Sequence, residues 1–287
     1  MRLMFGRTFN FLWNRVEITR PHNLLVAALT ILVGWAVARS GDFGWRIALA
    51  TLAGTLVAAA GNVVNDYFDA DIDRINKPRR PIPSGRMTRR ESWAYYWILN
   101  ALALAAGLGA GPRVLGFVLV WTGCLFLYSA RWKTQFLLGN LLVSAVSSSG
   151  FVLGAWLAGT PRAALVPASL AFLFIMGREI VKDVEDLAGD GACGARTLAH
   201  EWGARRALGV AAGFFALFVL AVPWPYTLQI YGPRYMLTYA LGVVPLLGVA
   251  ALLTWRDHSP GNLLRVSWIL KLDMLLGVLG FYWGAAR

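Results

Sequence analysis

Residues 45–73 read WRIALATLAGTLVAAAGNVVNDYFDADID, a long apolar run that ends in four aspartates. A second apolar run, 164–182, is followed by Asp183, Glu185, Asp186 and Asp190. With Glu179, these two clusters hold nine of the fifteen acidic residues of the chain. Carboxylates are costly beside hydrocarbon, so we expect them to act where they gather, as ligands of divalent cations.

The remainder of the chain is that of an all-α, polytopic membrane protein. Of its 287 residues, 57% are hydrophobic and 15% charged, which is too little polar surface to cover a soluble domain. A helix needs about 20 apolar residues to cross the hydrocarbon layer. The sequence predicts a single domain, 1–287, with nine spans at 23–39, 45–66, 92–111, 114–130, 136–158, 164–182, 207–228, 234–255 and 264–284.

The basic residues predict the orientation in the cell membrane. Segments on one side of the predicted spans carry 20 of the 27 Lys and Arg residues, and those on the other side carry six. By the positive-inside rule, the N-terminus and both acidic clusters are cytoplasmic. The net charge of +12 is therefore interpreted as topology and contact with anionic lipids, and not as a nucleic-acid-binding surface.

The first cluster forms a stripe if the helix continues through it. Asn65, Asp69 and Asp73 are spaced four residues apart, and Asp66 lies on the same side. Like charges at this spacing repel unless a cation is bound. Ligands that are all oxygen favour Mg²⁺, which takes one or two carboxylates, water and substrate phosphate. The alternative is a solvated helix end whose acids pair with Arg74, Lys77, Arg79 and Arg80.

The second cluster repeats the pattern, since Asp183, Asp186 and Asp190 also share one helix face. Two such stripes on two cytoplasmic helix ends could close around one metal-bound diphosphate. Residues 77–86, KPRRPIPSGR, contain three prolines and a glycine, which predict a stiff basic loop. Lys77 and Arg80 are candidate phosphate ligands there, unless the loop is only a positive-inside feature. Arg20, Tyr128, Lys133 and Arg196 are further candidates by position.

Other motifs are missing from the sequence. Cys124 and Cys193 form no CxxC pair, and no nucleotide-binding glycine loop occurs, which argues against a zinc site, a dinucleotide enzyme or an ATP-driven pump. Before the first span, Phe5, Phe9, Leu12, Trp13 and Val16 recur at helical spacing among arginines. Residues 1–20 therefore predict a helix in the membrane interface.

These motifs resemble those of the UbiA superfamily of intramembrane prenyltransferases. The resemblance rests on NDxxDxxxD at 65–73 with the basic loop after it, on DxxDxxxD at 183–190 followed by GARTL at 194–198, on YSxxxK at 128–133, and on RPxN at 20–23. It implies a helical bundle around a central cavity and transfer of a polyprenyl group from its diphosphate to an acceptor. It also implies a Mg²⁺-diphosphate site on Asn65, Asp69, Asp73, Asp186 and Asp190, flanked by Asp66 and Asp183, with Arg20, Asn23, Lys133 and Arg80 at the phosphates.

The run 177–190 is most similar to the branch of this family that transfers geranylgeranyl to geranylgeranylglyceryl phosphate. The alternative within the family is an aromatic acceptor of the quinone, tocopherol or chlorophyll type. A cation-coupled transporter is the alternative outside it, because Lys271 and Asp273 lie inside a predicted span. The sequence identifies no general base and leaves prenyl chain length and oligomeric state open.

An acceptor with its own phosphate needs further cations. Arg178 and Lys182 are spaced i, i+4 and can face one cavity edge, so we expect them to bind the acceptor. The alternative is that they pair with Glu179, Glu185 or Asp186.

The predicted orientation can be tested with single cysteines. Cysteines placed at Ser84 and Ala195 should react with a membrane-impermeant thiol reagent only from the cytoplasmic side, whereas one at Gly41 should react from outside, because the basic residues retain their flanking segments inside. Labelling at Ser84 in intact cells would show that the orientation is reversed.

Overall fold

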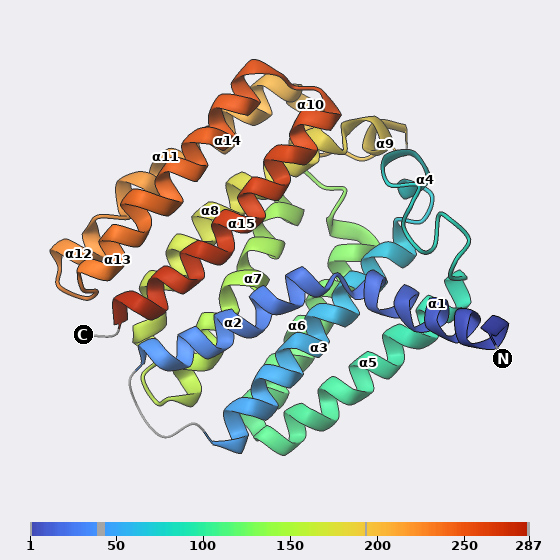
Figure 1. The fold of residues 1–287 in the computed structure, drawn as a ribbon, viewed down its shortest axis with the longest axis horizontal. Coiled ribbons are helices and arrows are strands. Elements are labelled where there is room, and N and C mark those ends of the chain that lie inside the picture. Colours follow the sequence, from blue (N-terminus) through green and yellow to red (C-terminus); the bar gives the residue numbers. More distant parts are fainter. Residues whose placement is uncertain (1, 39–43, 193, 286–287) are drawn as a thin grey trace. The chain divides into compact units, whose positions relative to one another are not determined.

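The computed structural model describes residues 2–38, 44–192 and 194–285, and these residues form helices and turns without any strand (Figure 1). The all-α prediction is confirmed. Cys193, Arg39, Gly41 and Arg287 lie outside the described residues, as do the side chains of Phe5 and Phe9. The α-helices are α1 (Arg2–Thr19), α2 (Pro21–Val37), α3 (Trp45–Phe68), α4 (Asp73–Asn76), α5 (Arg89–Ala110), α6 (Pro112–Leu127), α7 (Leu138–Leu157), α8 (Leu165–Glu185), α9 (Leu187–Ala192), α10 (Leu198–Trp202), α11 (Ala204–Ala221), α12 (Trp224–Thr227), α13 (Pro233–Thr238), α14 (Val244–Arg256) and α15 (Pro260–Ala285). A 3₁₀ turn, η2 (Pro161–Ala164), and two π-helical turns, η1 (Tyr128–Trp132) and η3 (Tyr239–Val243), complete the set.

The predicted spans coincide with helices. Within the described residues, seven helices are long and apolar enough to cross a membrane, and an eighth is counted if α1 from Phe11 and α2 form one span bent by 50°. The ninth predicted span is helical as α15, which carries Arg265, Lys271 and Asp273 and is not one of these seven helices. The protein is a multi-pass membrane protein whose expected set of about nine spans agrees with these helices.

The chain divides into two compact units. Unit 1 comprises Met1–Ala28 and Gly44–Trp132, and unit 2 comprises Leu29–Phe43 and Lys133–Arg287. Each unit contains one of the two acidic clusters. A single functional domain remains a prediction.

Unit 1 is built on close packing between α3 and α5. Small residues of α3, including Ala59 and Ala60, let α5 approach, and Tyr96 and Leu99 of α5 fill the space against Val63 and Val64. The start of α5 is fixed by a capping box, in which the side chains of Thr88 and Glu91 accept each other's backbone N–H groups. This packing holds the C-terminal end of α3, which carries the first acidic cluster.

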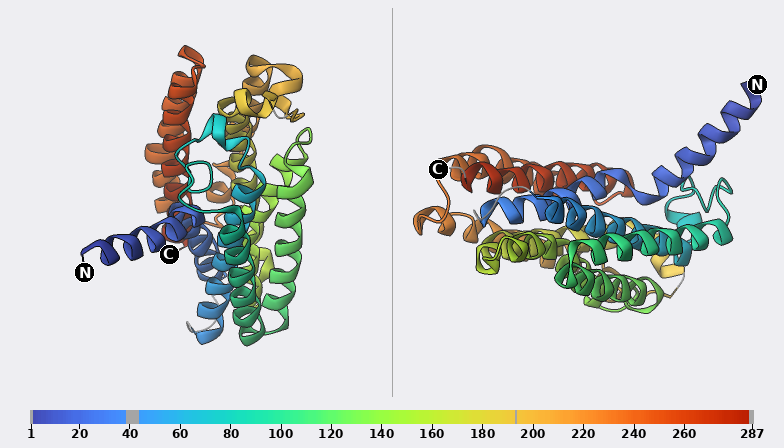
Figure 2. Two further views of the ribbon diagram at one scale, coloured as in Figure 1. Left: turned by 90° about the vertical axis from the view of Figure 1, so that its right-hand side faces the viewer. Right: turned by 90° about the horizontal axis from the view of Figure 1, so that it is seen from below.

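The helix α1 belongs to unit 1 and projects away from α3 and α5 (Figure 2). Its Phe11, Leu12, Trp13 and Val16 side chains are exposed, as an interfacial helix requires. Arg86, from the loop before α5, donates to both carboxylate oxygens of Glu17 at 2.6 and 2.8 Å. Of the helix expected over residues 1–20, Arg2–Thr19 are helical, while its place in the membrane interface remains a prediction.

Unit 2 depends on glycines where α2 and α7 meet. A Cβ atom at Gly154 of α7 would lie 2.0 Å from the Ile31 carbonyl oxygen, and one at Gly34 of α2 would lie 2.2 Å from the Phe151 carbonyl oxygen. Gly150 and Gly154 are four residues apart, the small-residue spacing that lets membrane helices touch backbone to backbone.

We therefore predict that Gly154→Val destabilises the protein. The added side chain forces α2 away from α7, and overpacking of this kind should lower the melting temperature in detergent by about 5 °C or more. Gly123→Val on α6 is the matched control, since a Cβ there meets nothing within 4 Å. Equal melting temperatures for the two variants would contradict the close approach of α2 and α7.

Candidate active site

The first acidic cluster lies where α3 ends. The helix stops at Phe68, and the expected continuous helix through Asp73 is wrong, because Asp69 is the C-cap and Asp73 begins the short helix α4. The stripe survives the break: the N–H of Asp69 donates to the Asn65 carbonyl at 2.9 Å, and the N–H of Asp73 donates to the Asp69 carbonyl at 2.7 Å. Asp71 lies outside the stripe, since its side chain is 60% exposed and pairs with Arg74 and Arg89.

The stripe is buried and neutralised by arginines. Asp66, Asp69 and Asp73 are only 2%, 5% and 3% exposed. Nη1 of Arg80 lies 3.1 Å from Oδ1 of Asp66 and 2.5 Å from Oδ2 of Asp73, and Arg20 donates to Asp66 as well. The amide of Asn65 donates to Oδ2 of Asp69 at 2.8 Å. The pairing alternative is thus correct for Arg80, but these acids are buried and the helix end is not a solvated one.

Burial makes the negative charge costly. It raises the pKa of Asp73, while the Arg80 guanidinium acts in the opposite direction and the neighbouring Asp66 and Asp69 raise the pKa further. The C-terminus of a helix adds partial negative charge of its own. The site therefore favours any further cation that reaches it.

The basic loop brings Arg80 to the acids and Arg86 to α1. The loop folds back through backbone hydrogen bonds from Ser84 to Arg80 and from Met87 to Pro81, both 3.0 Å long, and Gly85 turns with φ of 73°. Arg86 points to Glu17 and Asn14 of α1. Lys77 is half-buried at the end of α4. The expectation of a basic loop beside the acids is confirmed for Arg80.

The start of α2 brings Arg20 to the first cluster. Arg20 has φ of 55°, a strained value for a residue with a side chain, and it separates α1 from α2. Asn23 lies half-buried on the next turn, with its backbone N–H 2.8 Å from the Arg20 carbonyl. The bend of the chain thus directs the Arg20 guanidinium to Asp66.

The second cluster repeats this backbone geometry. Helix α8 stops at Glu185, the N–H of Asp186 donates to the Lys182 carbonyl at 2.9 Å, and the N–H of Asp190 donates to the Asp186 carbonyl at 3.1 Å. The match to the first cluster is 117 positions along the chain, from Asp69 to Asp186 and from Asp73 to Asp190. Leu137 also has φ of 55° and precedes α7, as Arg20 precedes α2 at the same offset. The two clusters are two copies of one local structure.

The groups that bind the acids differ between the two clusters. The carboxylate of Asp183 accepts from the amide of Asn140 at 2.8 Å, where the corresponding Asp66 accepts from two arginines. The sequence analysis missed Asn140, although the offset that relates the clusters also relates Asn23 to Asn140. It also missed Ser267 of α15, whose hydroxyl donates to Glu185 at the end of α8.

The cations of α8 bind an acid of their own helix. Arg178 donates to Oε1 of Glu179, and Nζ of Lys182 lies 3.4 Å from Oε2 of the same residue. The expected alternative, pairing with Glu179, is therefore observed. Arg178 nevertheless lies five residues before Asp183, and Lys182 directly precedes it.

The remaining candidates are Arg196, Tyr128 and Lys133. The side chain of Arg196 is 77% exposed and binds Glu201 at 2.7 Å, away from the acids. Tyr128 begins the π-helical turn η1 at the end of α6 in unit 1, and Lys133 begins the second segment of unit 2; both are half-buried.

The oxygen atoms fit Mg²⁺ by type. Among the described residues, no three of the His, Cys, Asp and Glu side chains are grouped closely enough to form a metal cage. Mg²⁺ does not need one, because it typically takes one or two carboxylates and completes its shell with water and substrate phosphate. The first cluster offers Asn65, Asp66, Asp69 and Asp73, and the second offers Asp183, Asp186 and Asp190.

Replacing Arg80 should expose its role as counter-charge. Arg80→Gln leaves Asp66 and Asp73 without their shared cation, and we expect the melting temperature to fall by about 5 °C or more, with part of the loss restored by millimolar Mg²⁺. Arg74→Gln is the matched control, because that side chain is 69% exposed and serves only Asp71. If both variants melt together, the buried carboxylates do not depend on Arg80.

Comparison with known proteins agrees with these features. The UbiA prenyltransferase family model matches residues 27–271. A digeranylgeranylglyceryl phosphate synthase of Methanothermobacter thermautotrophicus is 38% identical over 94% of this chain and 95% of its own. Another, of Halobacterium salinarum, is 38% identical over 94% of this chain and 96% of its own.

Solved structures share the fold. A digeranylgeranylglyceryl phosphate synthase superposes with a TM-score of 0.72 at 30% identity, covering 96% of this chain and 98% of its own. A UbiA homologue from Archaeoglobus fulgidus, bound to GPP and Mg²⁺, gives 0.68 at 19% identity over 93% of this chain and 99% of its own, which supports the fold alone. The chain belongs to the UbiA prenyltransferase family.

Proposed function

We propose that this protein transfers a geranylgeranyl group from its diphosphate to the free hydroxyl of geranylgeranylglyceryl phosphate. The observation that carries the proposal is the identity of 38% over 94% of the chain to relatives that are digeranylgeranylglyceryl phosphate synthases. The family match over residues 27–271 includes both acidic clusters. The substrates would be a prenyl diphosphate and a lipid acceptor, both reached from the membrane.

The reaction breaks the bond between the allylic carbon and the diphosphate oxygen. An ether bond then forms between that carbon and the acceptor oxygen, and the hydroxyl proton leaves with the diphosphate as the second product. The barrier arises from negative charge that develops on the departing diphosphate. Arg20 and Arg80, already held at Asp66, are the residues of unit 1 that would bind and stabilise it.

Magnesium would add positive charge at the same diphosphate. In the proposal, Asn65, Asp69 and Asp73 of the first cluster and Asp186 and Asp190 of the second hold it, flanked by Asp66 and Asp183. Oxygen-only ligands and burial support this role. Lys133 and Lys77 would bind phosphate, and Tyr128 would place its ring by the allylic carbon, which must be kept from water.

The acceptor phosphate would bind to unit 2. Arg178 and Lys182 are the cations of α8, the helix that leads into the second cluster, and both pair with Glu179. A phosphate carries more charge than a carboxylate and accepts more hydrogen bonds, so it can compete with Glu179 for both cations. Arg196, exposed and bound to Glu201, would join only by leaving that partner.

Product mass is the direct test of the proposed function. Purified protein in vesicles is given geranylgeranyl diphosphate with either geranylgeranylglyceryl phosphate or an uncharged phenol, with and without Mg²⁺. We expect digeranylgeranylglyceryl phosphate and diphosphate from the first acceptor only, and no product after chelation of the metal. A prenylated phenol without the ether product would instead support an aromatic acceptor, and diphosphate uptake without any product would support transport.

The metal assignment predicts the effect of removing single charges. Asp69→Asn and Asp186→Asn each delete one negative charge without changing volume, so each should lower turnover by about 10²- to 10³-fold while the protein stays folded. Asp71→Asn is the control, because Asp71 lies outside the buried stripe on an exposed ion pair with Arg89. Near-normal turnover in both cluster variants would reject the assignment.

The acceptor assignment predicts a selective change in KM. Lys182→Gln should raise the KM for geranylgeranylglyceryl phosphate more than that for the prenyl diphosphate, because a lost ground-state contact appears mainly in KM. An equal rise for both substrates would place Lys182 at the diphosphate instead.

A further inference from the structure

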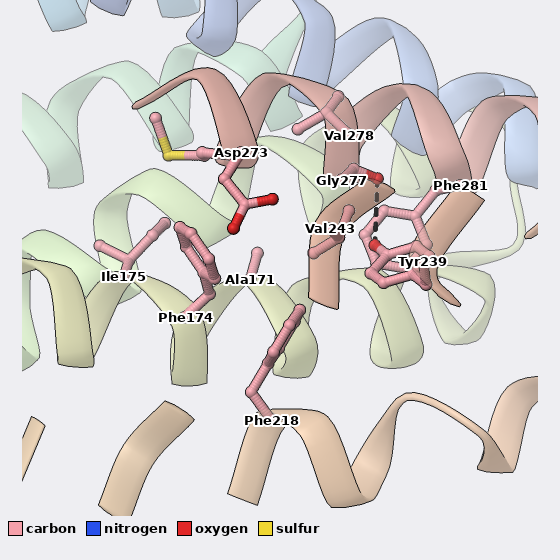
Figure 3. Close-up of a pocket in the computed structure, with 11 residues that line it drawn as sticks. Ala171, Phe174, Ile175, Phe218, Tyr239, Val243, Asp273, Gly277, Val278 and Phe281 are labelled. Carbon is pink, nitrogen blue, oxygen red and sulfur yellow. Dashed lines mark hydrogen bonds between the residues drawn. The ribbon is translucent and has the colours of Figure 1, made fainter. Parts of the chain in front are cut away.

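A small cavity within unit 2 contains a carboxylate. The cavity, of about 30 Å³, lies between α8, α11, α15 and η3, and its lining includes the rings of Phe174, Phe218 and Tyr239 (Figure 3). Figure 3 shows the Asp273 carboxylate pointing from α15 into this space, toward Ala171 and Phe174. Asp273 is 0% exposed, and neither carboxylate oxygen has a hydrogen-bond partner in the described part of the chain.

An ionised carboxylate in such surroundings is stabilised by pairing with a cation. An ionised acid inside a membrane span is rare unless it is paired, because hydrocarbon does not solvate the charge. The cavity lining contains no basic residue. Lys271 is close in sequence, but its ammonium lies 4.1 Å over the ring of Trp268.

Arg178 is the complementary group. Its Nη1 donates to Glu179, yet its Nε is buried without a hydrogen-bond partner. Across the described residues, the buried side-chain atoms without a partner are this one donor and the two acceptor oxygens of Asp273. Both residues belong to unit 2.

The register of α8 and α15 places the two residues at one level. Glu185 near the end of α8 meets Ser267 early in α15, while Ala171 early in α8 lines the cavity with Phe281 late in α15, so the helices are antiparallel. Arg178 is seven residues before Glu185 and Asp273 is six residues after Ser267, which corresponds to about 10.5 and 9 Å of helix.

Arg178 also lies on the side of α8 that faces α15. Seven residues separate it from Ala171 and seven from Glu185, and a seven-residue step returns to nearly the same helix face. Ala171 and Glu185 both meet α15, one at the cavity and one at Ser267. The arginine between them therefore shares that face.

We propose that Arg178 has two positions, one on Glu179 as observed and one on Asp273 inside the membrane, and that Asp273 is a positioning residue for acceptor binding. In the second position the guanidinium is withdrawn from the cytoplasmic end of α8, and Lys182 alone remains there with Glu179. Asp273 thus sets the fraction of molecules in which Arg178 is available to an acceptor phosphate. This consequence rests on the proposed function, whereas the pairing itself does not.

A thermal double-mutant cycle in detergent tests the pairing without any assay of activity. Arg178→Gln should lower the melting temperature of the wild-type protein by about 3 °C more than it lowers that of the Asp273→Asn variant, because only the wild type is left with an uncompensated buried carboxylate. Lys271→Gln is the matched control, since it removes a nearby cation of α15 and should cost the same in both backgrounds. If Arg178→Gln costs the same in both backgrounds, the pairing is rejected; Asp273→Leu repeats the cycle should the asparagine variant fold poorly.

Kinetics then test the positioning role. A molecule that binds the acceptor in only part of its population has a weakened apparent affinity, and removal of the competing state restores it. Asp273→Asn should therefore lower the KM for geranylgeranylglyceryl phosphate several-fold and leave the KM for the prenyl diphosphate unchanged. A raised or unchanged acceptor KM overturns the role, while a wild-type protein without transferase activity would overturn the proposed function and leave the thermal cycle to decide the pairing.

Discussion

The structure depends on neutralising carboxylates that are buried at the ends of hydrophobic helices. Asp66 and Asp73 share one guanidinium, that of Arg80, and Asp66 also receives Arg20. Because the helix C-terminus adds negative potential of its own, burying these carboxylates together is unfavourable without such partners. Two features of the chain supply these partners. The bend at Arg20 and the folded loop before α5 each bring an arginine to Asp66.

The second cluster has the same backbone solution with a different distribution of charge. Both helices end one residue before an aspartate, and both chains turn into a short helix whose aspartate binds back to the first. In unit 1 the cations bind the motif acids, whereas in unit 2 an amide serves Asp183 and the cations bind Glu179. One scaffold can thus present acids to a metal-bound diphosphate and keep a pair of cations for a second phosphate, which is the division of labour that the proposed reaction requires.

Within the spans, packing leaves little room for polar groups. Gly34 and Gly154 let the backbones of α2 and α7 touch. The hydroxyl groups of the tyrosines in α13 and η3 donate hydrogen bonds to the carbonyls of Val222 and Gly277. Asp273 differs from these tyrosines, since its carboxylate is buried and has no hydrogen-bond partner among the described residues. A carboxylate retained in such a place has a stabilising partner in some state of the protein, and the register of α8 and α15 identifies Arg178 as that partner.

The sequence alone predicted the helices, the membrane class, the two clusters and the family. Those features are encoded locally, in the length of apolar runs and in residues spaced by one helical turn. Only the tertiary structure decided which charges meet. From the sequence, Arg74, Lys77, Arg79 and Arg80 were equal candidates to pair with the first cluster. The fold of the proline-rich loop brings Arg80 to Asp66 and Asp73. The tertiary structure also paired Arg196 with Glu201 and brought Asn140 to Asp183 across 43 positions. The sequence could not show these contacts, because they depend on packing that periodicity does not record.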